Sequence, residues 1–554
     1  MGDRIEWLDG AVEADCPACG AAGAKPRVLR TRTLGPGARP ITLARCPACG
    51  LRFFADLGEP LSFEAAPAEA IEEHFELGIG LRGSVECLGR IDRGRVRTLL
   101  EVGCGTGLTL DFARHALGWQ VLGADTSAMS ARAVEELGVP IAAGLLGESA
   151  EIAAGVWDLV FACEVIEHVT RPAAFLAAVR AALTRGGAFL LRTPAAEGLA
   201  PGREERALVA ILSPGYHPML HTAGSLERLL RAAGFGDVHV LREGDTLHAA
   251  AAVDAVAWEP DGTLPDGAVP RYLDERADTL ATGLAARQGL LQQLTNEAVN
   301  RGDAATAAGA LTRLDATLRA RHGAGLDAAA DAVPPVKAAA FAGAFVAAAL
   351  AAELAGDRAR AADRFLAAAA ASEVAAALLR QLNSFHEGAE QTRELAERRA
   401  FALTVEDDPE RAAALLRQML AGPERDARLL ELFAHLVGAG AFDAALELAP
   451  EVERLLAPDA DGHAAREARW ALAMLLLHAA GRPADAAGQF ARATAEAADA
   501  DRAAAARFHE GYARWHAGDR DGADPLLRAT LADPAAAAWA EQAAALLAAP
   551  AYAG

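Results

Sequence analysis

The stretch that most constrains the fold of this chain runs from residue 99 to residue 110 and reads LLEVGCGTGLTL. A short apolar segment ends at Glu101, and glycines then occupy every second position, at Gly103, Gly105 and Gly107. Glycines in such a turn can adopt positive φ values and let a ligand lie directly against main-chain N–H groups. We therefore expect a strand, a ligand-binding turn and then a helix, which is how an α/β domain with a parallel sheet begins.

An acidic residue followed by GxGxG resembles motif I of the class I S-adenosylmethionine-dependent methyltransferases. Dinucleotide-binding folds use a similar pattern, but they place glycine or alanine three residues after the second glycine, where this chain has Leu108. The resemblance implies a Rossmann-like α/β domain with a seven-stranded sheet and S-adenosylmethionine as cofactor. The cofactor contacts that it implies here are Glu101, Gly103, Cys104, Gly105 and Gly107.

Further motifs in the expected order extend the resemblance over residues 96–250. A second strand over residues 120–123 leads to Asp125, which is placed to accept hydrogen bonds from both ribose hydroxyls, with Thr126 beside it. Asp125 can also cap the helix that follows, and neither role excludes the other. After a short third strand, the turn that ends at Leu145 is expected beside the adenine.

The expected fourth strand reads WDLVFAC and continues as EVIEHV, over residues 157–169. Its end places Cys163 and Glu164 at the carboxyl edge of the sheet, where ligands bind in doubly wound folds. This stretch resembles motif II of small-molecule methyltransferases, so both residues are counted among the cofactor contacts. A helix over residues 172–183, a double-glycine turn and a fifth strand over residues 188–192 are expected next.

Three histidines are candidates for the base that a hydroxyl or carbon-acid acceptor needs, because the ordinary histidine pKa lies near neutrality. We place His217 first, then His168 and then His221. The alternative roles are structural: a backbone hydrogen bond for His168, and packing against the following helix for His221.

The segment around His217 resembles the histidine-containing segment of nucleotide-sugar methyltransferases, which also carry a four-cysteine zinc module ahead of the core. The resemblance implies a small-molecule acceptor such as a nucleotide-activated or glycan sugar. Tyr216 stands where several sugar C-methyltransferases have glutamate, and their second α/β domain is missing here. Methylation at oxygen and at carbon therefore both stay open.

Residues 1–60 contain two CPACG knuckles, which supply Cys16, Cys19, Cys46 and Cys49. A two-residue gap lets both thiolates of a knuckle reach one tetrahedral ion, so the segment predicts a structural zinc ribbon. Iron in a rubredoxin-like site and a redox dithiol are the alternatives. Four protein ligands would close the site to substrate, which favours a structural role.

The rest of the chain is expected to be helical, with a connector over residues 61–95 and a turn-rich linker over residues 251–269. The resemblance implies that the connector lids the acceptor site, and an ordinary packing helix around His74 is the alternative. Over residues 270–554 a glycine followed by paired small residues recurs, as at Gly302, Gly356, Gly440, Gly481 and Gly518. The spacing scatters around the tetratricopeptide period of about 34 residues. We expect an all-α, tetratricopeptide-like solenoid that offers a surface to a protein partner or to a second copy; a helical cap without a partner is the alternative.

Composition limits the setting in which the protein works. The net charge of -22, from 53 Lys+Arg against 75 Asp+Glu, argues against a general nucleic-acid binder. The N-terminus has no secretory pattern. The apolar run from Ala338 to Ala352 stops at Glu353, and we judge it too short and too weakly hydrophobic to span a membrane. Seven cysteines in 554 residues do not make a disulfide scaffold, so we expect a cytoplasmic protein without a membrane partner.

Together these features predict a multidomain S-adenosylmethionine-dependent methyltransferase that acts on a small-molecule acceptor. The rival interpretation is a protein-interaction scaffold whose methyltransferase fold does not turn over. A nicotinamide-dependent oxidoreductase is disfavoured by Leu108 and by the CEVIEHV continuation, and nucleic-acid amino methylation by the absence of a (D/N)PP(Y/F) signature.

Overall fold

The computed structural model describes residues 5–35, 37–61, 67–146, 152, 155–329, 332–382, 384, 386–404, 415, 425–456, 463–497 and 500–549. The chain divides into two compact units, one comprising residues 1–356 and 367–393 and the other residues 357–366 and 394–554. Helices α13 (Arg358–Gln381) and α14 (Glu387–Thr404) contribute residues to both units.

The first unit begins with a six-stranded antiparallel sheet in the order β1-β3-β4-β5-β11, with β2 paired to β3. Its strands are β1 (Glu6–Trp7), β2 (Ala11–Glu13), β3 (Ala24–Arg32), β4 (Pro40–Arg45), β5 (Arg52–Phe54) and β11 (Met219–Leu220). The N-terminal module is therefore completed by β11, a strand that the chain forms between β10 and β12 of the second sheet.

The second sheet of this unit has seven strands in the order β12-β13-β10-β9-β6-β7-β8. Its strands are β6 (Thr98–Val102), β7 (Gln120–Asp125), β8 (Ile141–Ala143), β9 (Trp157–Cys163), β10 (Leu183–Pro194), β12 (Asp237–Glu243) and β13 (Thr246–Ala252). Strands β8, β7, β6, β9 and β10 are parallel, and β13 is antiparallel to both of its neighbours. The expected seven-stranded α/β sheet is therefore present. Its fifth strand starts at Leu183 rather than Ala188, with a register shift between them.

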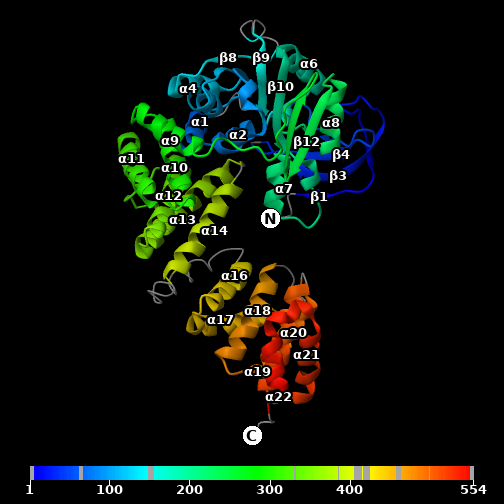
Figure 1. Cartoon of the computed structure of the whole chain (residues 1–554), viewed down its shortest axis with the longest axis vertical. Helices are drawn as coiled ribbons and strands as arrows, with labels where there is room; N and C mark the ends of the chain where they lie inside the picture. Colours follow the sequence, from blue (N-terminus) through cyan, green and yellow to red (C-terminus); the bar gives the residue numbers. More distant parts are fainter. Residues whose placement is uncertain are drawn as a thin grey trace. The chain divides into compact units, whose positions relative to one another are not determined.

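Apolar runs explain why these segments form central strands. Leu99, Leu100, Phe161 and Phe189 are fully buried, as expected for parallel strands that are covered on both faces. In Figure 1, α4 lies on one side of this sheet and α8 on the other. The helices associated with this sheet are α3 (Leu108–Ala116), α4 (Ala128–Leu137), α6 (Pro172–Ala182) and α8 (Ala223–Ala232), whereas α7 (Glu205–Leu212) packs against the six-stranded sheet.

The expected connector over residues 61–95 forms α1 (Ala68–Leu77), α2 (Leu81–Cys87) and two 3₁₀ turns, η1 (Leu88–Arg90) and η2 (Arg93–Arg95); residues 62–66 lie outside the described part. The segment expected as a linker is docked onto these turns. The N–H of Glu259 donates to the Arg90 carbonyl over 2.9 Å, and that of Asp92 to the Ala257 carbonyl over 3.2 Å. Turn-rich composition predicts a linker between domains, but the fold pairs backbone groups of this segment with the connector.

The boundary expected at residue 270 also differs from the structure, because helices after it belong to the first unit. These helices are α9 (Ala268–Thr279), α10 (Ala285–Asn300), α11 (Ala304–His322) and α12 (Ala338–Leu354). Tyr272 and Arg276 of α9 both donate to Oδ2 of buried Asp111 on α3, each over 2.8 Å. The N–H of Ala286 donates to Glu136 on α4 over 3.0 Å. Buried polar contacts of this kind join the helices to the α/β core.

One stretch of the described residues, Pro335–Leu354, is long and apolar enough by length and composition to cross a membrane, with a mean hydropathy of 1.7. This corrects the expectation that the apolar run is too short and too weakly hydrophobic, because the helical stretch starts before Ala338, runs past Ala352 and is apolar enough on average. Within the protein 61% of an 18-residue apolar segment of this stretch is buried, and Phe341 and Phe345 are fully buried. Burial of this extent also occurs in a core helix of a folded domain.

The second unit consists of helices over its described residues. They are α16 (Arg425–Gly438), α17 (Phe442–Leu455), α18 (His463–His478), α19 (Pro483–Ala495), α20 (Ala500–His516), α21 (Arg520–Ala532) and α22 (Ala540–Ala548). Gly440, Gly481 and Gly518 have φ values of 76°, 62° and 82°, and each lies between two consecutive helices. The left-handed conformation ends one helix and lets the next turn back.

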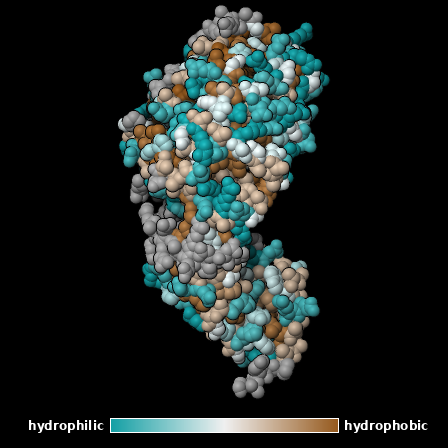
Figure 2. Space-filling view, turned by 90° about the vertical axis from the view of Figure 1, so that its left-hand side faces the viewer, coloured by the Kyte–Doolittle hydropathy of each residue, from teal (hydrophilic) through white to brown (hydrophobic). Residues whose placement is uncertain are grey.

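Large apolar side chains that stay exposed are scattered over many elements, among them Ile79, Val134, Val253 and Leu395. Figure 2 shows hydrophilic side chains interspersed with hydrophobic ones over the face it presents. Single exposed apolar residues of this kind are normal on a folded protein.

Candidate functional site

The four cysteines of the two knuckles come together between β2 and β5. The Sγ atoms of Cys16 and Cys49 lie 3.6 Å apart, and those of Cys19 and Cys46 lie 3.7 Å apart. Four thiolates at the usual Zn–S distance of about 2.3 Å form a tetrahedron with edges of about 3.8 Å. The spacing and the soft sulfur donors therefore fit one tetrahedral metal ion.

Backbone groups of the second knuckle favour the thiolate of Cys46. Burial opposes its ionisation, but hydrogen bonds from the backbone of Cys49 and Ala48 and from neighbouring cysteine side chains lower its pKa to about 7, whereas burial raises the pKa of Cys16 and Cys49. Gly20 and Gly50, which close the knuckles, have φ values of 70° and 87°. Only glycine adopts this conformation without strain, which explains the final residue of each CPACG.

The glycine turn lies between β6 and α3, with φ values of 69°, 46° and 66° at Gly103, Gly105 and Gly107. A Cβ on Gly103 would lie 2.5 Å from Val165 Cγ2, and one on Gly107 would lie 2.9 Å from Val139 Cγ2. Both the backbone conformation and the space therefore require glycine at these two positions.

Asp125 at the end of β7 fixes this turn. Its Oδ2 accepts the Gly105 N–H over 2.8 Å, and its Oδ1 accepts the Ser127 N–H over 2.6 Å. The carboxylate is thus oriented beside the glycines before any ligand binds. Thr126 is exposed next to it, and Leu145, beyond β8, is 57% exposed.

Glu101 and Cys104 lie on the inner side of the turn. Burial raises the pKa of Glu101 to about 8, although a hydrogen bond from Thr109 acts in the opposite direction. Oε2 of Glu101 has no hydrogen-bond partner. Cys104 is buried, and its Sγ would lie 2.6 Å from a Cβ on Gly123. Burial raises the pKa of the Cys104 thiol, so this side chain packs against β7.

At the carboxyl edge of β9, Glu164 has a φ of 56°, a conformation that few residues other than glycine adopt. Its N–H donates to the Arg192 carbonyl over 2.9 Å, and its carboxylate forms an ion pair of 3.1 Å with the Arg192 guanidinium. The same guanidinium lies 3.8 Å from Cys163 Sγ. Strain held in place by several contacts is typical of binding sites.

His168 and His217 lie together, with ring centroids 4.6 Å apart at an angle of 83°. His168 Nδ1 lies 3.1 Å from the Tyr216 carbonyl, and His217 Nδ1 lies 3.0 Å from the Ile211 carbonyl. A carbonyl only accepts, so each Nδ1 carries the proton when the ring is neutral. Burial, and to a smaller extent the nearby charge of His168, lower the pKa of His217 to about 3. Burial also lowers the pKa of His168.

Glu167 adjoins this pair. It is fully buried, accepts from Thr193 Oγ1 over 2.9 Å, and burial raises its pKa well above the ordinary value. Ligand atoms of Glu167, His168 and His217 all lie within 4.8 Å of one another, so the group could also hold a metal ion. His221 lies outside this group. It is fully buried with both ring nitrogens unpartnered, and burial lowers its pKa to about 4.

The histidine segment is attached to the cysteine module. Directly after His217, β11 pairs with β5 and sets Met219 opposite Phe53. Met219 is buried in one cluster with Cys16, Cys46 and Cys49. The segment that carries His217 is therefore held by the four-cysteine sheet.

Residues 80–240 match a family model described as a methyltransferase domain. These residues form a methyltransferase domain. The chain is 39% identical over 102 residues to a ubiquinone biosynthesis O-methyltransferase of Methylobacterium sp. (strain 4-46), a match that covers 17% of this chain and 40% of that protein. It is 35% identical over 143 residues to a probable S-adenosylmethionine-dependent methyltransferase of Mycolicibacterium smegmatis, over 25% of this chain and 52% of that protein. The chain thus spans about half the length, or less, of these curated relatives.

Solved structures of methyltransferases are similar to part of the chain. The structure of human N-acetylserotonin methyltransferase with S-adenosylmethionine aligns at 15% identity and a TM-score of 0.29, over 33% of this chain and 56% of that one. An O-methyltransferase family protein from Burkholderia thailandensis aligns at 18% identity and a TM-score of 0.29, over 35% and 64%. Neither similarity identifies the acceptor of this chain.

Within the methyltransferase domain, the structure brings the glycine turn to Asp125, Cys163 to Glu164, and His168 to His217. Sequence reasoning missed Arg192 and Glu167. Arg192 is opposite Cys163 in the register of β10 and β9. Because neighbouring parallel strands end at the same edge of a sheet, the position of Arg192 near the end of its strand could have indicated a place in the site. Glu167 could have been found as the carboxylate directly before His168.

Proposed function

We propose that the methyltransferase domain transfers a methyl group from S-adenosylmethionine to a small-molecule acceptor. The observation that carries this proposal is the orientation of Asp125 by Gly105 and Ser127 at the end of the second parallel strand. Each carboxylate oxygen has two lone pairs, so Asp125 can accept ribose hydroxyls in addition to its backbone donors. The glycine turn beside it supplies the close backbone approach that a cofactor needs.

S-adenosylmethionine supplies an activated methyl group, whose bond to sulfur breaks with its electron pair left on sulfur as the acceptor attacks. The protein then has to align the acceptor, exclude water and receive the acceptor's proton. We assign these tasks to His217 and His168. Since the pKa of His217 is lowered to about 3, its ring is neutral near pH 7, and because Nδ1 lies against the Ile211 carbonyl, the lone pair that receives the proton is on Nε2. We assign His221 a packing role.

We propose a nucleotide-activated or glycan sugar as the acceptor. The support is the resemblance of the His217 segment and the four-cysteine module to those of nucleotide-sugar methyltransferases. The O-methyltransferase name of one relative favours transfer to oxygen over transfer to carbon.

The test uses the full chain, S-adenosylmethionine with a deuterated methyl group, and separate panels of nucleotide sugars, glycans and phenols. Mass spectrometry should find the labelled methyl on a sugar. His217→Gln should lower turnover by about a hundredfold or more with cofactor binding retained. The matched control is His115→Gln, at a half-exposed histidine of α3. If the wild type binds S-adenosylmethionine and methylates no panel, the scaffold interpretation replaces this one.

We propose that the four-cysteine group holds structural zinc. The support is the tetrahedral spacing of its sulfurs and the closed set of four protein ligands. Metal analysis of the purified chain should find about one zinc per chain, lost in Cys49→Ser and kept in Cys87→Ser. Iron instead of zinc in the wild type would contradict this assignment.

We also propose that the helices of the second unit offer a surface to a protein partner or to a second copy, and that the protein works in the cytoplasm. The support is the series of helix pairs turned by glycine for the first proposal, and for the second the seven cysteines, none of which forms a disulfide. Light scattering of the full chain at micromolar concentration tests self-association, and a strictly monomeric mass would contradict it. Recovery of the protein outside the soluble cell fraction would contradict the location.

A further inference from the structure

Helix α1 is followed by a turn, residues 78–80, that contacts the glycine turn over residues 103–107. It ends at Gly78, which has a φ of 63°, and α2 begins after Gly80, which has a φ of 89°. Between them, the Ile79 carbonyl accepts the hydroxyl of Thr106 over 3.4 Å. Thr106 lies between Gly105 and Gly107 in the sequence. The turn over residues 78–80 is therefore in contact with the centre of the proposed cofactor-binding turn.

The end of α1 is seated on helix α10. A Cβ on Gly289 would lie 2.1 Å from the Phe75 carbonyl oxygen and 2.7 Å from the Gly78 nitrogen, so only glycine permits this approach. Gln293 donates its side-chain amide to the Leu77 carbonyl over 2.9 Å. Backbone packing and a hydrogen bond thus fix the last turn of α1 against α10.

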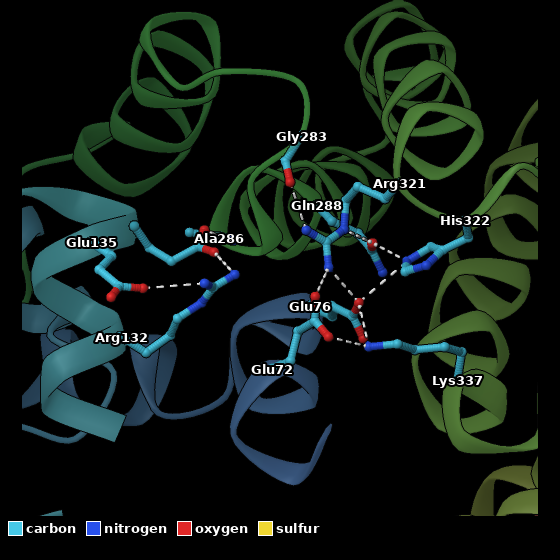
Figure 3. A network of polar contacts seen from close by, with 11 residues as sticks. Glu72, Glu76, Arg132, Glu135, Gly283, Ala286, Gln288, Arg321, His322 and Lys337 are labelled. Carbon is cyan, nitrogen blue, oxygen red and sulfur yellow. Dashed lines mark hydrogen bonds and ion pairs between the residues drawn. The ribbon is translucent and has the colours of Figure 1, made fainter. Parts of the chain in front are cut away.

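A charged network fixes the same helix to α11 and to the start of α12. Figure 3 shows Glu72 and Glu76 of α1 directed toward Arg321, His322 and Lys337. Arg321 Nη2 lies 2.6 Å from both Glu72 and Glu76, and Lys337 Nζ lies 2.6 Å from Glu72 and 3.1 Å from Glu76. His322 Nε2 is 3.2 Å from Glu76.

The centre of the network is buried, Glu72 at its edge is partly exposed, and the charges are nearly balanced. The side chain of Glu76 has no exposed surface and that of Arg321 has 5%. Burial opposes ionisation of Glu76, yet hydrogen bonds from His322 and Arg321 lower its pKa to about 2. Two carboxylates face two permanent cations, so moving α1 away would separate charges that the protein has removed from water. The helix is therefore confined to one position.

We propose that Glu76 and Arg321 are positioning residues for the cofactor site. By fixing α1, they hold the turn over residues 78–80 against Thr106 and so set the affinity for S-adenosylmethionine. Helices α10–α12 then act as a rigid wall of the methyltransferase domain. The inference rests on the proposed function, because it takes S-adenosylmethionine as the ligand of the glycine turn.

Two arginines of α11 provide a matched pair of variants. Arg321 binds α1, whereas Arg313 forms its ion pairs with Asp274 and Asp278 of α9. Titration of the full chain with S-adenosylmethionine should show Arg321→Met binding about tenfold more weakly than wild type, and Arg313→Met within about twofold of it. Arg321→Lys, which keeps the charge, should recover most of the loss. Equal affinity in all variants, or an equal loss in both methionine variants, would overturn the proposal.

A second measurement needs no ligand. Hydrogen–deuterium exchange of the free chain should be faster over residues 74–82 and 103–108 in Arg321→Met, and unchanged there in Arg313→Met. If Arg321→Met does not fold, Lys337→Met breaks the network at its other cation and should show the same pattern. Unchanged exchange over both segments would overturn the proposal. Failure of the wild type to bind S-adenosylmethionine would instead count against the proposed function.

Discussion

His168 and His217 are held with their rings nearly perpendicular, 4.6 Å apart, and each ring has Nδ1 bound to a backbone carbonyl. The burial that creates this pair makes the protein sensitive to acid. The folded pKa of His217 is about 3, against an ordinary value of 6.5. Between these values the unfolded chain binds a proton at residue 217 that the folded chain does not. The free energy of unfolding therefore falls as the pH is lowered, by up to about 1.4 kcal/mol per pH unit from this group.

Denaturant unfolding at a series of pH values between 7 and 4 measures this effect. His217→Gln should have the shallower loss of stability with acidification, because glutamine does not titrate. His221→Gln should behave similarly, since the folded pKa of His221 is about 4. Parallel curves for wild type and His217→Gln would show that His217 is not held neutral.

Alanine substitutions at two glycines measure separately how much stability is lost through an unfavourable backbone conformation and how much through a steric clash. Gly103 and Gly138 have φ values of 69° and 67°, but a Cβ meets Val165 at 2.5 Å on Gly103 and finds nothing within 4 Å on Gly138. Gly138→Ala should lose about 1 kcal/mol of stability, and Gly103→Ala about 1–3 kcal/mol more. Thermal and denaturant unfolding measure both. Equal losses would mean that the turn moves away from Val165 at no cost.

Metal removal should disturb the histidine segment before the cofactor side. Met219 is buried with the cysteines, whereas Met129 lies by the glycine turn, with its Sδ 3.5 Å from a Cβ on Gly105. The chain has five methionines, so methyl-labelled methionine gives few NMR signals. Chelation should shift or broaden the Met219 signal and leave that of Met129 in place. Loss of both signals together would indicate collapse of the whole unit, and loss of neither would mean that the metal does not support β11.

The contact between α9 and α3 should contribute measurably to stability. Tyr272→Phe removes the hydroxyl that donates to buried Asp111, while Arg276 still pairs with that carboxylate. We expect a loss of about 1–3 kcal/mol in the unfolding of the first unit. Tyr512→Phe, at a half-buried tyrosine of the second unit, is the control. An unchanged stability of Tyr272→Phe would argue that α9 is only loosely attached.

Local features could be predicted from the sequence because the chemistry lies in a few consecutive residues. The alternate glycines, the acidic residue after the second strand and the paired knuckles each specify their own backbone geometry. The structure accordingly places Asp125 beside Gly105 and brings Cys16, Cys19, Cys46 and Cys49 to one point.

Features that depend on distant partners could not be predicted in the same way. Glu76 and Arg321 are far apart in the chain, and neither has a local pattern that marks it as buried. The same holds for Tyr272 and Asp111, so the helices after residue 270 were assigned to a separate domain. The turn-rich segment over residues 251–267 shows a further limit. Its composition predicts turns, but it does not tell whether the segment packs on another part of the protein, as it does on Arg90 and Asp92.

Calorimetric titration of the full, metal-loaded chain with S-adenosylmethionine tests the central claim most directly, with two aspartate variants beside the wild type. Asp158 is the matched control: like Asp125 it accepts two backbone N–H groups, from Arg97 and Thr98, but near the start of β9 rather than at the carboxyl edge of the sheet. We predict saturable binding by the wild type, at least about tenfold weaker binding by Asp125→Asn, and binding within about threefold of wild type by Asp158→Asn. Absence of binding by folded wild type, or unchanged affinity in Asp125→Asn, would contradict the account.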